Sequence, residues 1–360
     1  MPPSEPMRQA IAAALSARGR TSPNPWVGAV LVREGEVIAT GATAPPGGPH
    51  AEAAALANID ATGATLYTTL EPCMPFPGKR TRPCAEVIAE AGVAKVVIGL
   101  EDPHEPVAGH GAAYLRSHGI DVETGDGADE VRALLRPYLK HVQTRLPYVI
   151  AKFAVSLDGK VGAPAHGVRW LTSEAARERA HADRAWVDAI AVGSGTVLAD
   201  DPALTARPGG QLSSHQPVRV ILDTRGRISP RARALGPGSI VATATADQAW
   251  AASITATGAT VIHVESSAEG LNLDQLLSIL GERSVLSLIL EGGPTLLASA
   301  FGAGLVDEVH AYIAPMVLGP DGLPLLAGAT TFAPEALQDV EIELLHPDVL
   351  VRGYTGAWTP

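Results

Sequence analysis

The stretch GGPHAEAAALANI, residues 47–59, places two reactive side chains at the start of an alanine-rich helix. His50 and Glu52 lie two positions apart, directly after a Gly-Gly-Pro turn. The following segment, ATLYTTLEPC (64–73), predicts a strand that leads into Pro72 and Cys73. A second cysteine, Cys84, lies near the start of the helix expected over 82–91. This alternation of strand and helix favours an α/β fold.

The same alternation continues on both sides of this stretch. A helix is expected over 5–17 and two strands over 27–43. Further strands are expected at 95–100 and 120–125, with helices at 110–118 and 128–143. A domain boundary is expected near QTRLPYVIAK (143–152), where Pro147 interrupts the helical pattern. The predicted domains are residues 1–145 and 146–360.

The second half repeats the pattern and ends differently. Its expected strands and helices are, in chain order, strand 148–156, helix 173–186, strands 189–197, 218–224, 239–245 and 259–265, helix 272–281 and strand 284–291. The final segment, VEIELLHPDVLVRGYTG (340–356), alternates in the manner of an antiparallel hairpin.

Composition narrows the range of functions. The 360 residues are 46% hydrophobic and carry a net charge of −11. An acidic chain is poorly suited to neutralising many phosphates, so we expect no nucleic-acid partner. The N-terminus is charged, and no charge-free apolar stretch approaches membrane length, so we expect a cytoplasmic protein without a membrane anchor.

One histidine and two cysteines supply three ligands of the kind that zinc prefers. His50, Cys73 and Cys84 would leave the fourth tetrahedral position to water. Zinc lowers the pKa of such a water and makes hydroxide available near neutral pH. Glu52, close to the metal without binding it, would carry a proton to a departing nitrogen. These residues predict zinc-dependent hydrolytic deamination, in line with the His-x-Glu and Pro-Cys signature of zinc deaminases.

The chain resembles the bifunctional riboflavin-biosynthesis deaminase–reductase family. The resemblance is carried by SPNPWVGAVLV (22–32), PHAE (49–52), TLEPC (69–73), GKRTRPC (78–84) and DPHEPVAGHG (102–111). It implies a cytidine-deaminase-like three-layer N-terminal domain and a phosphorylated pyrimidine as substrate. It also implies substrate contacts for Asn24 and for Lys79, although Asn24 between two prolines also suits a plain turn.

The segment between the cysteines departs from the family. The residues MPFPGKRTRP (74–83) form a longer loop than usual and lack its customary histidine. This departure leaves open an alternative in which the deaminase half has degraded and only a reductase remains.

In the second half, LILEGGPTLLASAF (288–301) predicts a strand that runs through Gly292 and Gly293 into a helix starting at Pro294. Exposed backbone N–H groups at such a junction suit a cofactor phosphate, and glycine permits close approach. Taken alone, the same junction is also common in proteins that bind no cofactor.

Four segments resemble the reductase half of the same family, which is similar in fold to dihydrofolate reductase and uses NADPH. They are AKFAVSLDGKVG (151–162), RWLTSEAAR (169–177), GTVLADDPALTAR (195–207) and EGGPTLLASAF (291–301). The resemblance implies cofactor contacts from Ala154, Trp170, Thr196, Asp200, Thr224, Gly293, Pro294, Thr295, Leu296, Leu297, Ala298 and Ser299. It implies substrate contacts from Val168, Arg184, Leu204, Arg207 and Glu291.

Three ionisable residues are candidates for proton transfer during the reduction: Lys152, Asp200 and Glu291. Opening a ribosylamine and delivering hydride to its former anomeric carbon both require proton movement. Arg184 and Arg207 could clamp a sugar phosphate. The residue at 168 is a valine where the family usually has a hydroxyl-bearing side chain.

Other interpretations remain open from the sequence. His50 and Glu52 could cap a helix while the cysteines are buried or form a disulfide. The chain could be a base deaminase acting on nucleic acid, or a non-catalytic sensor that binds zinc and a dinucleotide. We expect a homo-oligomer, because sheets of this kind often pair across subunits.

Overall fold

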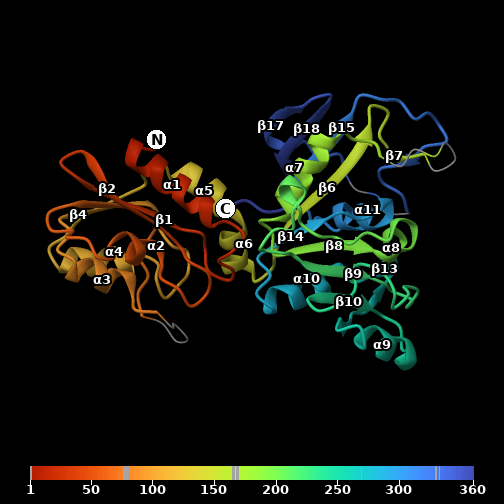
Figure 1. The fold of residues 1–360 in the computed structure, drawn as a ribbon, viewed down its shortest axis with the longest axis horizontal. Helices are drawn as coiled ribbons and strands as arrows, with labels where there is room; N and C mark the ends of the chain where they lie inside the picture. Colours follow the sequence, from red (N-terminus) through yellow and green to blue (C-terminus); the bar gives the residue numbers. More distant parts are fainter. Residues whose placement is uncertain are drawn as a thin grey trace. The chain divides into compact units, whose positions relative to one another are not determined.

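The computed structural model describes residues 2–75, 81–163, 167, 170–268, 270–328, 331 and 333–360. The chain divides into two compact units, Met1–Arg145 together with Pro360, and Leu146–Thr359 (Figure 1). Lys79 and Val168 lie outside the described residues. None of the described helices is both long enough and apolar enough to span a membrane.

The first unit is a sheet with helices on both faces. Its described strands form the order β2-β1-β3-β4-β5, in which β1 is antiparallel to β2 and β3 while β3, β4 and β5 are parallel. The strands are β1 (Gly28–Arg33), β2 (Glu36–Ala42), β3 (Thr65–Leu70), β4 (Lys95–Leu100) and β5 (Asp121–Thr124). The helices are α1 (Glu5–Ala17), α2 (Ala51–Ala55), α3 (Cys84–Glu90), α4 (His110–Ser117), α5 (Ala128–Leu134) and α6 (Arg136–Thr144).

Two glycines on opposite faces of the β1–β2 hairpin let helices approach the sheet closely. A Cβ atom at Gly28 would lie 1.9 Å from the Ala10 carbonyl oxygen of α1. A Cβ atom at Gly41 would lie 2.2 Å from the Ala51 carbonyl oxygen of α2. Gly41 pairs with Ala29, the neighbour of Gly28, so the two glycines point to opposite faces. Helices α1 and α2 therefore pack on opposite sides of the sheet, which makes a three-layer unit.

The helix expected over 128–143 is two helices. Helix α5 ends at Leu134, and α6 begins at Arg136 with Pro137 in its first turn. Proline has no N–H to donate and clashes with the preceding turn, so it ends one helix and suits the start of the next. The sequence pattern located the helical region correctly but missed this break.

The second unit is built on a larger mixed sheet. Its described strands form a nine-stranded order, β11-β10-β9-β8-β14-β6-β15-β18-β17. These strands are β6 (Tyr148–Ser156), β8 (Ala189–Gly193), β9 (Val218–Leu222), β10 (Ser239–Thr243), β11 (Thr260–His263), β14 (Ser287–Leu290), β15 (Glu308–Ala314), β17 (Gln338–Leu345) and β18 (Asp348–Tyr354). Two small sheets pair β12 (Ser266–Ser267) with β13 (Gly270–Leu271) and β7 (Lys160–Gly162) with β16 (Leu323–Pro324).

Helices cover both faces of this sheet. They are α7 (Glu174–Arg184), α8 (Ser194–Asp200), α9 (Gln248–Thr255), α10 (Leu273–Glu282) and α11 (Pro294–Gly302), with a 3-10 turn η2 (Pro208–Gly210). Residues of α10 and α11 join a core with Val149, Ala151 and Val309 of the sheet. The alanines of α7 instead pack against Tyr312 and Leu350. Because Val309 and Tyr312 point to opposite faces of β15, α7 lies on the face opposite α10 and α11.

The predicted α/β fold class is confirmed, and several further details differ. The segment 189–197 is a strand only to Gly193, after which Ser194 begins α8. Strand β15 and helix α9 were not predicted. The expected hairpin over 340–356 is present as β17 and β18, paired antiparallel.

Candidate functional site

The first candidate site joins His50, Cys73 and Cys84 at the ends of three elements. His50 is the residue before α2, Cys73 follows β3 and Cys84 begins α3. Nδ1 of His50 lies 3.5 Å from Sγ of each cysteine. The backbone N–H of Cys84 points to Sγ of Cys73 at 3.4 Å. Both cysteines are free of disulfide bonds, and the three ligand atoms lie within 4.8 Å of one another.

This spacing fits a tetrahedral zinc ion. With ordinary Zn–S and Zn–N bond lengths, a sulfur and a nitrogen bound to one zinc lie about 3.6 Å apart. The other ring nitrogen of His50, Nε2, lies 3.4 Å from the Thr81 hydroxyl. A partner on the outer nitrogen of a metal-binding histidine fixes the tautomer and the ring orientation. Thr81 was not singled out from the sequence, although it lies three positions before Cys84.

Glu52 lies beside this cluster, in the first turn of α2. Its side chain is buried, at 3% exposure. Burial, and next to it the charge of Cys73, raise the pKa of Glu52 to about 7 against opposing effects that include those of His50 and Cys84. A glutamate that is close to the ligands and able to exchange a proton is suited to general acid–base chemistry.

A second buried glutamate, Glu71, holds the loop beside the cluster. Its carboxylate accepts hydrogen bonds from the backbone N–H groups of Asp102, Gly109 and Ala112. Glu71 directly precedes Pro72 and Cys73. It therefore connects the segment that carries Cys73 to the loop 102–109 and to α4. Burial raises the pKa of Asp102 to about 6, although Tyr138 donates a hydrogen bond to it. Glu71 lies in TLEPC and Asp102 in DPHEPVAGHG, but no role was predicted for either residue.

Asn24 lies in a turn of the first unit. Its backbone N–H donates to the Thr21 carbonyl at 2.8 Å, and the Thr21 hydroxyl donates back to the Asn24 carbonyl. The side-chain amide is half-buried and makes no hydrogen bond to any residue that the structure describes. The backbone of Asn24 therefore forms the expected turn, and its side-chain amide remains available to bind a ligand.

The second candidate site is an ion cluster in the second unit. Arg184, the last residue of α7, contacts Glu291 through two parallel 2.7 Å bonds, from Nε to Oε1 and from Nη2 to Oε2. Lys152 of β6 lies 3.4 Å from Oε2 of the same glutamate. Burial alone would raise the pKa of Glu291, but Arg184 and Lys152 reverse this effect and lower it to about 2. Glu291 is therefore a charged carboxylate with two cationic partners.

The third ionisable candidate, Asp200, is placed differently. It is exposed at the last position of α8, and its side chain makes no hydrogen bond or ion pair with any residue that the structure describes. Thr196, one turn earlier on α8, lies beside Gly293, where a Cβ atom would be 3.6 Å from the threonine hydroxyl. Gly293 is the residue before α11, the helix that contains the remaining predicted cofactor positions from Pro294 to Ser299. The structure thus brings α8 and the start of α11 together.

Three other predicted residues of this unit lie on separate segments of the chain. Ala154 lies on β6 and packs against the α7 alanines. Trp170 is exposed, with the guanidinium of Arg177 5.2 Å from the centre of its ring. Thr224 follows β9, where its hydroxyl would lie 3.8 Å from a Cβ atom at Gly270.

The segment with Leu204 and Arg207 is attached to α7. The Thr205 carbonyl between them accepts hydrogen bonds from Nη1 of Arg184, at 3.2 Å, and from the His181 ring. Leu204 is buried with a positive φ of 53°, and Arg207 is exposed. Burial lowers the pKa of His181, and the charges of Arg184 and Arg207 lower it further. An exposed arginine beside this cluster is suited to binding an anion.

Family models match both units. Residues 3–100 match the cytidine and deoxycytidylate deaminase zinc-binding region, and residues 147–351 match the RibD C-terminal domain. The riboflavin biosynthesis protein RibD of Bacillus amyloliquefaciens is 39% identical over 355 residues, which cover 95% of this chain and 94% of the relative.

Solved structures show the same likeness over nearly the whole length. Acinetobacter baumannii RibD, form 1, aligns with a TM-score of 0.85 at 35% identity and covers 97% of this chain and 98% of the other. A diaminohydroxyphosphoribosylaminopyrimidine deaminase/5-amino-6-(5-phosphoribosylamino)uracil reductase from Thermotoga maritima aligns with a TM-score of 0.82 at 33% identity, covering 97% of each chain.

Proposed function

Because the chain belongs to the RibD family of bifunctional riboflavin-biosynthesis enzymes, with zinc and NADPH as cofactors, we propose that residues 1–145 form the deaminase and residues 146–360 the reductase. The deaminase would act on 2,5-diamino-6-ribosylamino-4(3H)-pyrimidinone 5′-phosphate. The reductase would then convert the ribosyl group of the deaminated product to ribityl. The His50–Cys73–Cys84 cluster beside Glu52 is the observation that carries the deaminase assignment.

In the deaminase, His50, Cys73 and Cys84 would hold the zinc. When bound there, zinc supplies a hydroxide nucleophile at neutral pH. Glu52 takes the proton released from water and delivers it to the amino group that leaves the ring as ammonia. Thr81 keeps the His50 ring turned with Nδ1 toward the two sulfurs. Asn24, with its free amide, is proposed to bind the pyrimidine. Lys79 remains a predicted substrate contact.

In the reductase, NADPH supplies the hydride. The residues from Gly293 to Ser299 and Thr196 are proposed to line the cofactor, because the start of α11 and α8 lie together. Lys152 is the proposed proton donor to the ring oxygen as the sugar opens, with Glu291 fixing its ammonium group.

The proposal also assigns a residue to bind the substrate phosphate and roles to the remaining predicted reductase residues. Arg207 is proposed to bind the phosphate, since it is exposed next to the ion cluster. The guanidinium of Arg184 is already engaged by Glu291 and the Thr205 carbonyl, so we propose that it orients Glu291 and the Leu204 segment. Asp200, Ala154, Trp170, Thr224 and Val168 remain predicted contacts.

The decisive experiment uses the purified full chain and the diaminopyrimidinone phosphate, with and without NADPH. Without NADPH, we expect stoichiometric ammonia and accumulation of the ribosylamino product. With NADPH present, one NADPH should be oxidised for each ammonia released, and the oxidation should come after the release. Oxidation of NADPH only when the deaminated compound is supplied would instead support a chain with reductase activity alone.

We also propose that the protein is a cytoplasmic homo-oligomer that pairs through β17. This strand is an outer strand of the nine-stranded order. Val340, Ile342 and Leu344 are 51%, 68% and 79% exposed and alternate along it, which forms an apolar stripe. Antiparallel pairing with β17 of a second copy would satisfy the open strand edge and bring the two apolar stripes into contact side by side.

Sedimentation velocity tests the pairing. Ile342→Glu should shift the protein toward the monomer, whereas Val317→Glu, at an exposed apolar residue outside the stripe, should not. An Ile342→Glu variant that sediments as the parent does would contradict the proposed surface.

A further inference from the structure

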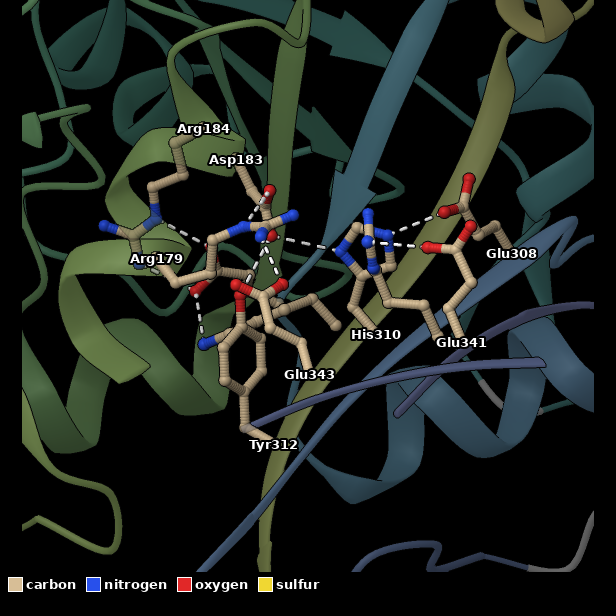
Figure 2. A network of polar contacts seen from close by, with 11 residues as sticks. Arg179, Asp183, Arg184, Glu308, His310, Tyr312, Glu341 and Glu343 are labelled. Atoms are coloured by element: carbon tan, nitrogen blue, oxygen red, sulfur yellow. Dashed lines mark hydrogen bonds and ion pairs between the residues drawn. The ribbon is translucent and has the colours of Figure 1, made fainter. Parts of the chain in front are cut away.

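Strand β15 contributes a buried polar cluster that none of the assigned roles uses. His310, Tyr312 and Asp183 of α7 are each less than 5% exposed. Figure 2 shows these three side chains converging between α7 and the sheet, with Glu308 on the far side of the histidine. Burying ionic groups is costly unless each is paired, so such a cluster is weak evidence for stability by itself.

The contacts of His310 fix its charge. Its Nδ1 lies 3.1 Å from Oδ2 of Asp183, and its Nε2 lies 2.7 Å from Oε1 of Glu308. While both carboxylates are ionised they can only accept hydrogen bonds, so in that state both ring nitrogens carry protons and the ring is an imidazolium. Burial would lower the pKa of His310, but the hydrogen bonds to Asp183 and Glu308 raise it to about 9.

The surrounding charges agree with this assignment. The register partners of His310 are Lys152 on β6 and Arg352 on β18, so three cations lie in one row across the sheet. Glu291 pairs with Lys152, and Glu341 pairs with Arg352. From α7, Arg179 contacts Asp183 as well as Glu343 of β17. Asp183 and Glu308 therefore serve as the counter-charges of His310.

This cluster reaches Lys152 through Tyr312. The phenol O–H of Tyr312 donates to Oδ2 of Asp183 at 2.9 Å, on the oxygen that also faces His310. The centre of the Tyr312 ring lies 5.4 Å from Nζ of Lys152. An ammonium at this distance from an aromatic face is attracted to it. The last two residues of α7 thus each contact a neighbour of Lys152. Asp183 binds Tyr312, and the adjacent Arg184 binds Glu291.

We propose that Asp183, His310 and Tyr312 form a positioning cluster that holds the Lys152 ammonium against Glu291 for the reduction, and that this arrangement requires the imidazolium form of His310. The proposal rests on the role assigned above to Lys152. His310 and Asp183 act through Tyr312 and are positioning residues.

The expected pH dependence follows from the raised pKa of His310. The imidazolium contribution is fully present below the ordinary histidine value of about 6.5. It is lost as the pH rises through about 9. At that point Asp183 and Glu308 lose the cation between them, and Tyr312 loses its fixed acceptor. The reductase kcat should therefore decline through this range.

The test compares reductase kinetics of the full chain, given the deaminated substrate and NADPH, between pH 6 and pH 10. His310→Gln should lower kcat at pH 7 at least about 10-fold while KM changes less than about threefold, since a small displacement of a reacting group has large kinetic effects. The alkaline decline near pH 9 should also weaken. His263→Gln, at an exposed histidine of β11, is the matched control and should behave as the parent.

Two substitutions of Tyr312 keep the test decisive if His310→Gln folds poorly. Tyr312→Leu removes the ring beneath Lys152 and should lower kcat about 10-fold. Tyr312→Phe keeps the ring but removes the hydrogen bond to Asp183 through which the cluster acts, so its kcat should fall about as far as in His310→Gln and its alkaline decline should weaken in the same way. Deaminase activity of the same preparations reports whether the chain is intact.

Parental kcat and an unchanged pH profile in both His310→Gln and Tyr312→Leu would overturn the proposal, even if both variants melt earlier. Lys152→Ala is measured in parallel. If it remains an active reductase, the role of Lys152 fails and the positioning proposal fails with it. If it is inactive while His310→Gln and Tyr312→Leu are unaffected, only the positioning proposal fails.

Discussion

Glu52 and Glu291 are both buried glutamates beside a proposed reaction centre, yet their surroundings act in opposite directions. Burial disfavours the charged form of each. Beside Glu52 the nearby cysteine adds to this effect, and its pKa rises to about 7. Beside Glu291 two cations outweigh it, and its pKa falls to about 2. The comparison teaches that partners, rather than depth, decide what a buried carboxyl can do.

The two environments imply two kinds of chemistry. A carboxyl that is easily protonated can move a proton during each turnover, which is the task proposed for Glu52. A carboxylate that stays charged can hold and orient cations, which is the task proposed for Glu291 toward Lys152 and Arg184. The same residue type therefore serves as a proton carrier in one unit and as an anchor in the other.

Removing zinc should have the largest effect of the changes considered, and it should affect the deaminase activity alone. Treatment with a strong chelator should abolish ammonia release, because His50, Cys73 and Cys84 would no longer hold the ion that supplies the hydroxide nucleophile. The reductase contains no metal-ligand set of this kind among its described residues, so NADPH oxidation with the deaminated substrate should persist. Zinc should restore ammonia release. Equal loss of both activities on chelation would contradict the division between the units.

Glu52→Gln tests the proton carrier with the metal in place. Because glutamine cannot exchange the proton, ammonia release should fall on the order of 10³-fold. Zinc content by elemental analysis and reductase activity should match the parent. Glu130→Gln, at an exposed position in the first turn of α5, is a control of the same chemistry at a helix that carries no metal ligand. Retained deamination in Glu52→Gln would contradict the assigned role.

Glu291→Gln tests the anchor. The substitution keeps the size of the side chain and leaves Lys152 and Arg184 without their counter-charge. Reductase kcat should fall on the order of 10²-fold, because the proton donor loses its fixed position. Glu282→Gln, at the exposed end of α10, is the matched control. Parental reduction by Glu291→Gln would show that Lys152 does not need this partner.

Thr81→Val should have the smallest of these effects. It removes the oxygen that lies 3.4 Å from Nε2 of His50 without changing a zinc ligand. Zinc affinity, measured by competition with a chromogenic chelator, should fall about 10-fold. Thr40→Val, at an exposed position of β2, should bind zinc as the parent does. An unchanged affinity in Thr81→Val would remove this residue from the metal site.

The sequence was sufficient to predict that His50, Cys73 and Cys84 lie together, because these ligand types fall in short motifs. His50, Cys73 and Cys84 come together at the ends of α2, β3 and α3, as the predicted metal set requires. The alternation of apolar strands and helices predicted the α/β class for the same reason. The additional partners Thr81 and Glu71 were missed, since a hydroxyl or a carboxyl acquires such a role only from its neighbours in space.

The cluster on β15 shows where sequence reasoning stopped. EVHAYIA (308–314) alternates apolar residues with Glu308, His310 and Tyr312, so one face of the strand looks solvent-exposed. That face is buried because α7 covers it and Asp183, more than 120 residues earlier, supplies the acceptor. The pairing of Arg184 with Glu291 spans 107 positions and was equally invisible. Ion pairs between distant segments follow from topology, which local pattern does not specify.

The close approach of α2 to the hairpin at Gly41 makes deaminase function vulnerable far from its reactive atoms. A methyl group there would meet the Ala51 carbonyl, and Ala51 follows His50 directly. A random screen for chains that reduce but no longer release ammonia should therefore recover substitutions at this glycine alongside the metal-binding residues. Deamination thus depends on the absence of a side chain at Gly41, in a strand that takes no direct part in the reaction.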